Sequence, residues 1–405
     1  MTVAIEPKVR ARYAAKRDAI MAAATTVFAD QGLSGFTLAA VAKRMDLHPV
    51  SLTYYFKRKE DLAAAVLYET IDRYGEMLSL AEAGATPPER LRTLVTAYFE
   101  TRARVALGQE IPLAPFNEIA LIEGEQHAPL MEAFHTIYIR IAQLLKSEEM
   151  PWMTRLKRQA LARLVVNALT WSDSWIGGYA PEDYPRVAAR MAEIMLDGLG
   201  RSWPQLELLP LGTPSAENDE VTRDRFLVAA TKLINKEGYR GASVDKISAE
   251  LKVTKGSFYH HNTDKDDLAA ACFGRSFDLI DQARRQATSA PTGWERLWLA
   301  VASLSMHQAA GDGGRMLRHY ALSAVPPSMR KQQIVRFQQI AHAFAGVISD
   351  GVADGSIRAV DPLLAAHYVM VVYNVALPMD RALAGDTTGL IEDYVKPALG
   401  GFFSQ

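Results

Sequence analysis

The sequence of 405 residues contains a single cysteine, Cys272. One thiol excludes an internal disulfide and any zinc site built from several cysteines. Long apolar runs are also missing, because the longest, 368–379, is too short to cross a bilayer and is interrupted by Asn374 and Pro378. The first residues lack an apolar signal core, so we expect a cytoplasmic protein that makes no membrane contact.

Signatures of catalysis and metal binding are absent from the sequence as well. There is no Gly-x-Ser-x-Gly, no His-Glu-x-x-His and no His-x-x-x-His. A Ser-x-x-Lys match at 328–331 stands alone, and the glycines of 311–314 lack the preceding strand that a phosphate-binding loop needs. The neighbours His260 and His261 would point about 100° apart on a helix, so they cannot easily share one ion. We therefore expect no enzymatic activity, no cofactor and no metal site.

Charge is nearly balanced over the whole chain, with a net charge of −1, but it is unevenly distributed. Residues 1–65 carry ten Lys and Arg against six Asp and Glu, a net charge of +4. Residues 223–271 carry nine against seven, which gives +2 and leaves −7 for the remainder. Gathered positive charge favours binding to a polyanion, although a charge run is more often a solvated surface.

An internal repeat accounts for the two basic segments. The stretch KVTKGSFYHHNTDKDDLAAA at 252–271 matches DLHPVSLTYYFKRKEDLAAA at 46–65, which lies 206 residues earlier. The match extends without a gap over 17–65 and 223–271. Because this period is too long for a solenoid repeat, the sequence predicts two copies of one whole domain.

Each copy is expected to form three short helices. Apolar residues recur at amphipathic helical spacing over about 17–31, which predicts the first helix. Thr37 and Ser243 each offer a side-chain oxygen to cap the second helix of their copy. A turn of three residues follows at 46–48 and at 252–254.

The third helix begins at Pro49 or Lys255, should end near Phe56 or His261, and completes a helix-turn-helix arrangement. Such a helix has the width to enter a DNA major groove. Its surface positions carry hydroxyl, aromatic, amide or basic side chains, which donate to phosphates and base edges. The pattern therefore indicates that each copy binds DNA.

Three motifs in these copies are specific in combination. The first copy contains Ala-Ala-x-x-x-Phe-x-x-x-Gly at 23–32 and Ser-Leu-x-Tyr-Tyr-Phe-x-x-Lys-x-x-Leu at 51–62. The second contains Lys-Gly-Ser-Phe-Tyr-His-His at 255–261. On these residues each half resembles a member of the TetR family of one-component regulators. The resemblance implies an all-α protein of two TetR-like halves, each with a helix-turn-helix domain and a helical ligand-binding and dimerisation domain.

The resemblance also implies which residues of each head contact DNA. In the first head they are Thr37, Lys43, His48, Pro49, Val50, Ser51, Thr53, Tyr54, Tyr55 and Lys59. In the second head they are Ser243, Lys246, Thr254, Lys255, Gly256, Ser257, Tyr259, His260, His261 and Lys265. Thr53 stands where the family usually has tyrosine, and Asn262 stands where it usually has phenylalanine. The two heads are therefore expected to read different half-sites or to bind with unequal strength.

The remaining residues of each half read as helices. The expected domains are a first head at 1–62, a helical domain at 63–200, a linker at 201–218, a second head at 219–268 and a second helical domain at 269–405. Proline and glycine in the linker favour an extended tether. Family members resemble homodimers joined by their last two helices, here expected at 155–176, 185–199, 362–377 and 387–403. One chain is therefore expected to be a monomeric pseudo-dimer, with a dimer of such chains as the alternative.

A small-molecule site is expected among aromatic residues of the helical domains. The candidates are Tyr98, Phe99, Phe116, His135, Tyr138, Trp171 and Trp175 in the first half, and Trp298, His307, His319, Tyr320, Tyr368 and Tyr373 in the second. Apolar walls with a few polar groups suit such a site. The alternative for each of them is a position in the core of an amphipathic helix, and Trp171 and Trp175 are equally suited to an interface between the halves.

The expected function is that of a ligand-responsive transcription factor, in this family usually a repressor. Its partners would be a double-stranded DNA operator, pseudo-palindromic or asymmetric, and a small apolar or aromatic effector that releases the DNA. The alternative is a protein of the same fold that no longer regulates DNA and binds a protein or a small molecule instead.

Overall fold

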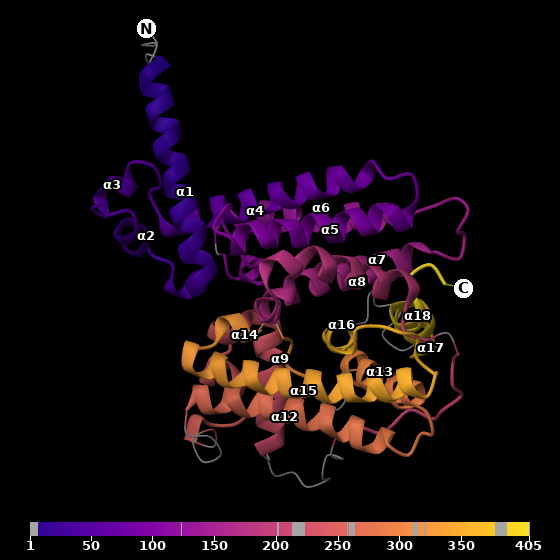
Figure 1. Cartoon of the computed structure of the whole chain (residues 1–405). Coiled ribbons are helices and arrows are strands. Elements are labelled where there is room, and N and C mark those ends of the chain that lie inside the picture. Colours follow the sequence, from indigo (N-terminus) through magenta and orange to yellow (C-terminus); the bar gives the residue numbers. More distant parts are fainter. Residues whose placement is uncertain are drawn as a thin grey trace. The chain divides into compact units, whose positions relative to one another are not determined.

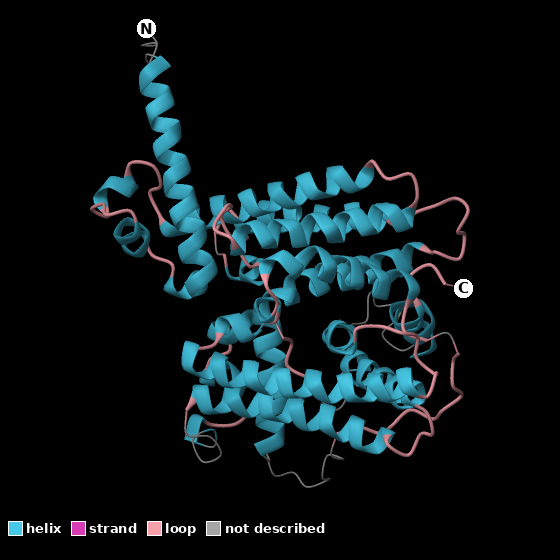
Figure 2. Ribbon diagram, in the orientation of Figure 1, coloured by secondary structure: helices cyan, strands magenta, loops and turns pink. Residues whose placement is uncertain are grey.

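The structure is a computed structural model that describes residues 7–122, 124–200, 202–212, 223–256, 258, 264–310, 315–319, 321–376 and 387–404. Every regular element in these ranges is a helix, which confirms the predicted all-α class (Figures 1 and 2). Within the same ranges, no helix combines the length and the hydropathy needed to cross a membrane.

The chain divides into two compact units. The first consists of Met1–Ser79 with Glu100–Ile137, and the second consists of Leu80–Phe99 with Tyr138–Gln405. The second unit thus takes residues from both halves of the chain. The domain boundaries expected from the sequence follow the repeat instead, and they stay a prediction.

The first unit contains the first head. Its helices are α1 (Pro7–Gly35), α2 (Leu38–Arg44), α3 (Val50–Thr53), the start of α4 (Lys59–Glu82), the end of α5 (Pro87–Ala106), the 3-10 helix η1 (Phe116–Leu121) and the start of α6 (His127–Leu144). Helix α1 is longer than the expected 17–31 and is interrupted at Gly32, where φ is 61° and ψ is 177°. Beside this break, the buried carboxylate of Glu118 accepts a hydrogen bond from the backbone N–H of Leu33 at 3.2 Å. Helix α1 is thereby tied to η1.

The second unit contains the remaining helices. They are α7 (Arg155–Trp171), α8 (Tyr184–Asp197), α9 (Arg223–Gly241), α10 (Val244–Leu251), α12 (Lys265–Ala287), α13 (Gly293–Ala310), α14 (Ala321–Ala324), α15 (Pro327–Ala353), α16 (Pro362–Val375), α17 (Thr387–Leu390), the π-helical turn η5 (Ile391–Val395) and α18 (Lys396–Gly400). Short 3-10 turns join α7 to α8: η2 (Ser172–Ser174), η3 (Ile176–Gly178) and η4 (Pro181–Asp183). Helix α7 therefore ends earlier than the expected residue 176.

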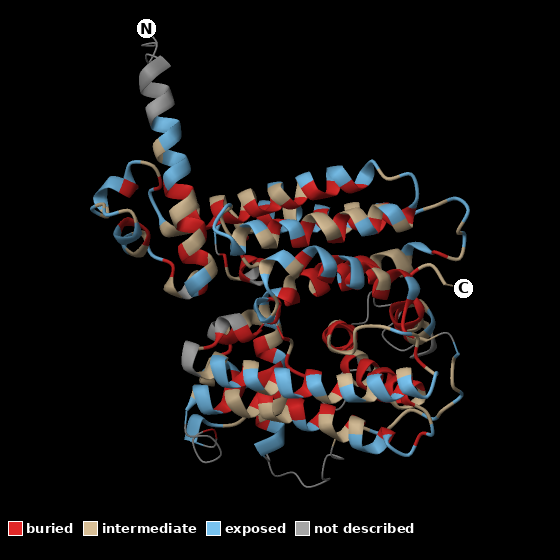
Figure 3. Cartoon of the chain, viewed as in Figure 1, coloured by how far each residue is buried: buried red, intermediate tan, exposed pale blue. Residues whose placement is uncertain are grey.

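Helices from both halves of the chain pack together in the second unit, as the pseudo-dimer prediction requires. Helices α7 and α8 contact α16, and the η5–α18 segment contacts α7 and α8. Helix α16 is buried around its whole circumference from 364 to 374 (Figure 3). Two tyrosine hydroxyls tie the last helices together, since Tyr368 donates to the carbonyl of Ala398 at 2.9 Å and Tyr394 donates to that of Val372 at 2.6 Å. The predicted four-helix packing is confirmed.

The last helix of each half ends against the other half through its backbone. The N–H of Leu199 donates to the carbonyl of Leu399 at 2.7 Å, and the N–H of Phe402 donates to that of Met195 at 2.8 Å. Arg358 adds a third link, because its Nε donates to the carbonyl of Gly198 at 2.5 Å. Its Nη2 donates to the carbonyl of Glu193 at 2.9 Å, so this guanidinium caps helix α8 from the other half.

The described part of the linker is docked and is not a tether. The carbonyl of Ser202 accepts a hydrogen bond from Trp294 Nε1 at 2.5 Å, and Trp203 packs against the rings of Trp294 and Trp298. Further along, the N–H of Leu209 donates to Ser303 Oγ at 2.9 Å and that of Gly212 donates to Gln282 Oε1 at 3.2 Å. Residues 202–212 therefore bind to α12 and α13. The prediction of an extended tether is wrong for 202–212, because tryptophan and leucine residues lie between the prolines and pack against apolar side chains. Residues 213–218 of the expected linker lie outside the described residues.

Candidate nucleic-acid interface and ligand pocket

In the first head, α3 is positioned by the capped helix before it, by the turn between them and by buried apolar side chains. Thr37 Oγ1 accepts a hydrogen bond from the N–H of Ala40 at 3.0 Å, which is the predicted N-cap of α2. The turn passes through Asp46 with a φ of 53°, a left-handed conformation that aspartate tolerates better than most residues. Leu52 and Phe56 are buried beneath α3. Helix α3 itself ends at Thr53, earlier than the expected residue 56, and turns complete the segment.

The outer face of α3 is exposed. Val50 is 67% exposed and Tyr54 is 76% exposed, both unusually high for residues of their size. Tyr55 is half-buried because its ring stacks on that of Tyr13 from α1, with centroids 4.8 Å apart. The hydroxyl of Thr53 donates to the carbonyl of Val50 at 2.8 Å, so its proton is already used within the helix.

Cations surround this face in the first head. Lys43 and Arg44 at the end of α2 and Lys57 after α3 are exposed, and none of them forms an ion pair with a described residue. Arg58 does form one, with Asp61 at 2.9 Å, which raises the pKa of Arg58 through the hydrogen bond between them. Of the other expected DNA contacts in this head, Ser51 and His48 are exposed, and Pro49 and Lys59 are partly exposed.

The second head repeats the caps and the turn of the first. Ser243 Oγ accepts a hydrogen bond from the N–H of Lys246 at 3.3 Å, which is the predicted cap of α10. Lys252 has a φ of 56°, at the place in the copy that Asp46 holds in the first. Thr254, Lys255 and Gly256 are exposed. The other expected contacts, Ser257, Tyr259, His260 and His261, lie outside the described residues, as does Asn262.

Three lysines of the second head are paired with acids of the same head. Lys246 bonds Glu237 at 2.6 Å, Lys255 bonds Asp245 at 2.5 Å, and Lys232 bonds Glu250 at 2.5 Å. The hydrogen bond from each lysine lowers the pKa of Glu237 and of Glu250. Lys265 lies over the ring of Tyr239, 4.5 Å from its centroid. At the places of the three acids the first copy has Gln31, Ala39 and Arg44, so the two heads differ in charge where they are otherwise alike.

The aromatic candidates of the first half are distributed over both units. In the first unit, Phe116 packs between Tyr74 and Phe134, while His135 is exposed. In the second unit, Tyr98 and Phe99 are buried: Tyr98 donates to Asp173 Oδ1 at 3.2 Å, and the ring of Phe99 lies beside that of Trp175. Tyr138 is half-buried beneath Arg163.

The aromatic candidates of the second half are mostly packed in the core. Trp298 lies against Trp203, and His307 is half-buried beside Gly212. Tyr373 faces the ring of Phe344, and burial raises its pKa well above its usual value. Tyr368 is the buried donor in the bundle described above, whereas Tyr320 lies outside the described residues.

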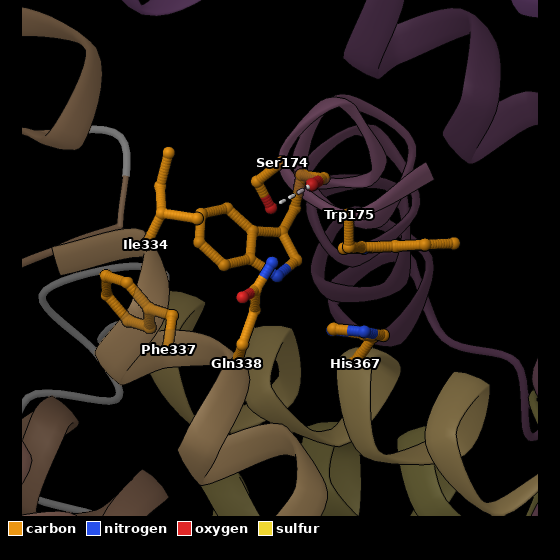
Figure 4. A pocket seen from close by; sticks show the side chains of 7 residues that line it. Ser174, Trp175, Ile334, Phe337, Gln338 and His367 are labelled. Atoms are coloured by element: carbon orange, nitrogen blue, oxygen red, sulfur yellow. Dashed lines mark hydrogen bonds between the residues drawn. The ribbon is translucent and has the colours of Figure 1, made fainter. Parts of the chain in front are cut away.

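A pocket, called here the junction pocket, lies in the second unit where the end of α7 meets α15 and α16 (Figure 4). It contains about 230 Å³ of empty space, including its open mouth. Its lining residues are Trp171, Ser174, Trp175, Ile334, Phe337, Gln338 and His367. Two of the expected ligand residues, Trp171 and Trp175, thus line one pocket together. The other five had not been identified from the sequence, because which residues of α15 and α16 meet the first half is a matter of tertiary packing.

Two buried histidines of the second half lie against these tryptophans. The ring of Trp171 is 4.6 Å from that of His319, and the ring of Trp175 stacks on that of His367 at 4.8 Å with an interplanar angle of 10°. His319 Nδ1 donates to Asn374 Oδ1 at 2.7 Å. Burial lowers the pKa of both histidines to about 4, so both rings are neutral at pH 7.

Two capped helix-turn-helix heads in one chain, joined by helices that pair across its two halves, define a double-headed DNA-binding fold. The family model of the bacterial regulatory proteins of the tetR family matches residues 20–66 and again 226–272, which are these two heads. The chain therefore carries two domains of the tetR family in tandem.

Curated relatives match over roughly a fifth of the chain. The TetC protein of transposon Tn10 from Escherichia coli is 36% identical over 81 residues, 20% of this chain and 41% of that protein. The HTH-type transcriptional repressor KstR2 of Mycolicibacterium smegmatis is 32% identical over 95 residues, 23% of this chain and 46% of that protein. Each match thus spans less than half of the relative.

Two solved structures each align with less than half of this chain. AibR in complex with isovaleryl coenzyme A and operator DNA is 23% identical, covers 43% of this chain and 100% of its own, and has a TM-score of 0.35. The TetR family regulator PfmR from Thermus thermophilus is 21% identical, covers 46% of this chain and 98% of its own, and has a TM-score of 0.37.

Proposed function

We propose that the chain is a transcriptional repressor that binds one operator through two unequal heads and is released by a small molecule. The observation that carries the proposal is the outer face of the first head. An exposed hydroxyl and aromatic face on α3, with Ser51 and Tyr54, is bordered by Lys43, Arg44 and Lys57, which have no acidic partner among the described residues. Hydroxyls and aromatic edges suit base contacts in the major groove, and unpaired cations suit phosphates.

The second head supports unequal binding. Three of its lysines are held by Glu237, Asp245 and Glu250, so their contact with a phosphate must first compete with an internal acid. Exposed ion pairs of this kind contribute only about 0–1 kcal/mol, so DNA can displace them, although the acids still repel its backbone. We infer that the first head supplies more of the salt-dependent affinity, and that the operator is asymmetric.

A gel-shift titration with the DNA upstream of the chain's own coding region tests the proposal. We expect a specific complex whose affinity falls steeply with salt. Changing both Lys43 and Arg44 to Gln should weaken it and should reduce the salt slope by about 2, if each residue contacts a phosphate. Arg186→Gln, on the exposed surface of α8, is the matched control and should change neither quantity. Absence of any salt-sensitive complex at nanomolar protein would overturn the proposal.

A reporter gene driven by the same upstream region tests whether the chain represses transcription and whether an effector releases it from the DNA. Repression by the wild-type chain, its loss in the Tyr54→Ala variant, and relief by an effector are the expected results. Light scattering should give a mass near 45 kDa, that of one chain, if both heads come from one pseudo-dimer. A mass near 90 kDa would show that two chains are needed.

A second function is favoured by one observation. The Thr53 hydroxyl is used inside α3 and three lysines of the second head are paired, as in a protein that keeps the fold but binds a different partner. Failure of the gel shift together with binding of a small molecule by the same preparation would favour this reading.

A further inference from the structure

Three buried polar atoms, one from each of three residues that line the junction pocket, have no hydrogen-bond partner among the described residues. They are Nε1 of Trp171, Nε1 of Trp175 and Nδ1 of His367, and each of these residues is only 7% exposed. A buried polar group left unpaired costs about 1–3 kcal/mol. A bound molecule that accepts or donates hydrogen bonds here would remove this free-energy cost. Buried unpaired polar groups in a native fold often mark a binding site.

The walls of the pocket define what that molecule can be. Trp171, Trp175, Phe337 and His367 supply aromatic faces, whereas the lining contains no Lys, Arg, Asp or Glu. Figure 4 shows the Trp175 ring lying over His367, and the ring of Trp171 lies 5.2 Å from that of Phe337. The two indole N–H groups can only donate, so they require an acceptor atom. Most of the 230 Å³ is open to solvent, and the enclosed part has room for about one water molecule, so an aromatic molecule must part these side chains to enter.

We propose that the junction pocket binds a small, uncharged aromatic molecule that carries a hydrogen-bond-accepting oxygen. The aromatic ring lies among the side-chain rings, and the oxygen accepts from the indole N–H groups. Burial without a countercharge would disfavour a carboxylate or an ammonium group.

The chain provides this site once. His367 lies six residues after Asp361, the N-cap of α16, and the residue six after Thr154, the N-cap of α7, is Ala160. Alanine can neither stack on an indole nor present a ring nitrogen. A symmetric copy of the His367 wall is therefore missing from the first half, and we expect one molecule to bind per chain, that is, one per two heads.

The pocket is connected to the second head. Trp171 lies against His319, whose backbone N–H and Nδ1 both donate to Asn374 Oδ1. The same segment is held from the other side by Asn235 of α9, the first helix of the second head: its Nδ2 donates to the carbonyl of Met316 at 3.0 Å, and its Oδ1 accepts from the N–H of Arg318 at 2.9 Å. On the proposed function, on which this step rests, a molecule that displaces Trp171 would shift α9 and weaken DNA binding.

Calorimetry and ligand-observed NMR on the full chain without DNA test the site. The probes are acetophenone, ethylbenzene, which has a similar shape but no acceptor, and benzoate, which carries a charge. We expect acetophenone to bind with a stoichiometry of one, and at least tenfold more tightly than either of the others. No binding of acetophenone, or equal affinity for acetophenone and ethylbenzene, would overturn the proposal and would indicate that the pocket holds water alone.

Conservative variants locate the binding. Trp171→Phe and Trp175→Phe keep an aromatic ring but remove the donor, and each should weaken acetophenone by about three- to tenfold, the effect of one hydrogen bond. The matched control is Trp152→Phe, because Trp152 Nε1 is also buried and unpaired but lies outside this pocket. Trp152→Phe should change the affinity for acetophenone by less than about twofold. An equal loss of affinity in all three variants would contradict the assignment of binding to the junction pocket.

A gel shift with and without acetophenone separates the site from its role. If acetophenone binds but the DNA affinity is unchanged, the site stands and the connection to the second head is wrong. If the chain forms no complex with DNA while acetophenone still binds, the proposed function fails and the site stands. A reduction of DNA affinity in the wild type that is lost in Trp175→Phe supports both.

Discussion

Gly198 and Gly401 meet at the end of the bundle, one from the last helix of each half. Both have a positive φ, 67° and 99°. A Cβ on Gly198 would lie 2.1 Å from the carbonyl carbon of Gly400, and one on Gly401 would lie 2.5 Å from the carbonyl oxygen of Leu196. The two helix ends can therefore exchange backbone hydrogen bonds only because neither has a side chain there.

Gly198→Ala should destabilise the second unit by more than the ordinary penalty for a positive φ. That penalty is roughly 1–2 kcal/mol, and here displacement of the opposite backbone adds to it. Gly355→Ala is the control, because Gly355 has a φ of 80° but nothing within 4 Å of a Cβ. Urea unfolding of both variants should give a clearly larger loss for Gly198→Ala. Equal losses would mean that the helix ends separate without cost.

Arg358→Ala should lower the free energy of unfolding by about 2 kcal/mol, because it leaves two carbonyls at the end of α8 without their charged donor. Arg358→Lys should recover little, since one ammonium cannot reproduce the two directions of a guanidinium. Arg190→Ala, an exposed residue of α8 paired to Glu193, is the control and should cost less than about 0.5 kcal/mol. Full recovery in the lysine variant would argue against the two-directional contact.

Local features of the fold were predictable from sequence, and contacts between distant segments were not. Thr37 and Ser243 cap their helices as expected because capping depends on neighbouring residues. The helices of the pseudo-dimer were also placed correctly, since their apolar faces follow the helical period. In contrast, the contact between Gly198 and Gly401 has no periodic signal, because it depends on where two remote helices end.

The residues of the candidate sites likewise divide into those that a local motif predicts and those that depend on contacts between distant segments. Tyr54 and Lys43 were named from a local motif, and both are exposed in the first head. Trp171 and Trp175 were named as aromatic residues of the right kind, but their partner His367 could not be found, since it lies on a helix of the other half. The pairing of Lys246 with Glu237 also went unnoticed, because net charge does not show which ions meet.

Glu237→Gln should strengthen DNA binding by the second head. The substitution removes a negative charge beside Lys246 and leaves in its place the residue type that the first copy has at Gln31. A gain of about two- to fivefold in affinity is expected at low salt, and it should shrink as salt rises. Glu193→Gln on α8 is the control. An unchanged affinity would mean that this side of the second head does not face the DNA.

Stability of the second unit should fall as the pH is lowered from 7 to 5. Burial lowers the pKa of His319 and of His367 to about 4 in the folded chain, against about 6.5 when unfolded. Between these values the unfolded state binds protons that the native state does not, so stability is lost as the pH falls through this window. The loss at pH 5 is roughly 2 kcal/mol per histidine.

Urea unfolding of His367→Phe at both pH values measures this effect. Phenylalanine keeps a ring against Trp175 but cannot titrate, so the difference between pH 7 and pH 5 should shrink by roughly 2 kcal/mol. Trp175→Phe is the control, since it changes the same contact without removing a titratable group. If His367→Phe leaves the difference as large as in the wild type, His367 is protonated in the folded state.

The docking of residues 202–212 on α12 and α13 would affect how the two fragments associate if the chain were cleaved. A cut after Gly212 would leave this segment at the end of the first fragment, while Trp294, Ser303 and Gln282, which hold it, would be on the second. The two fragments would then be held together by this docked segment as well as by their paired helices. The docked segment would also determine which fragments recognise each other.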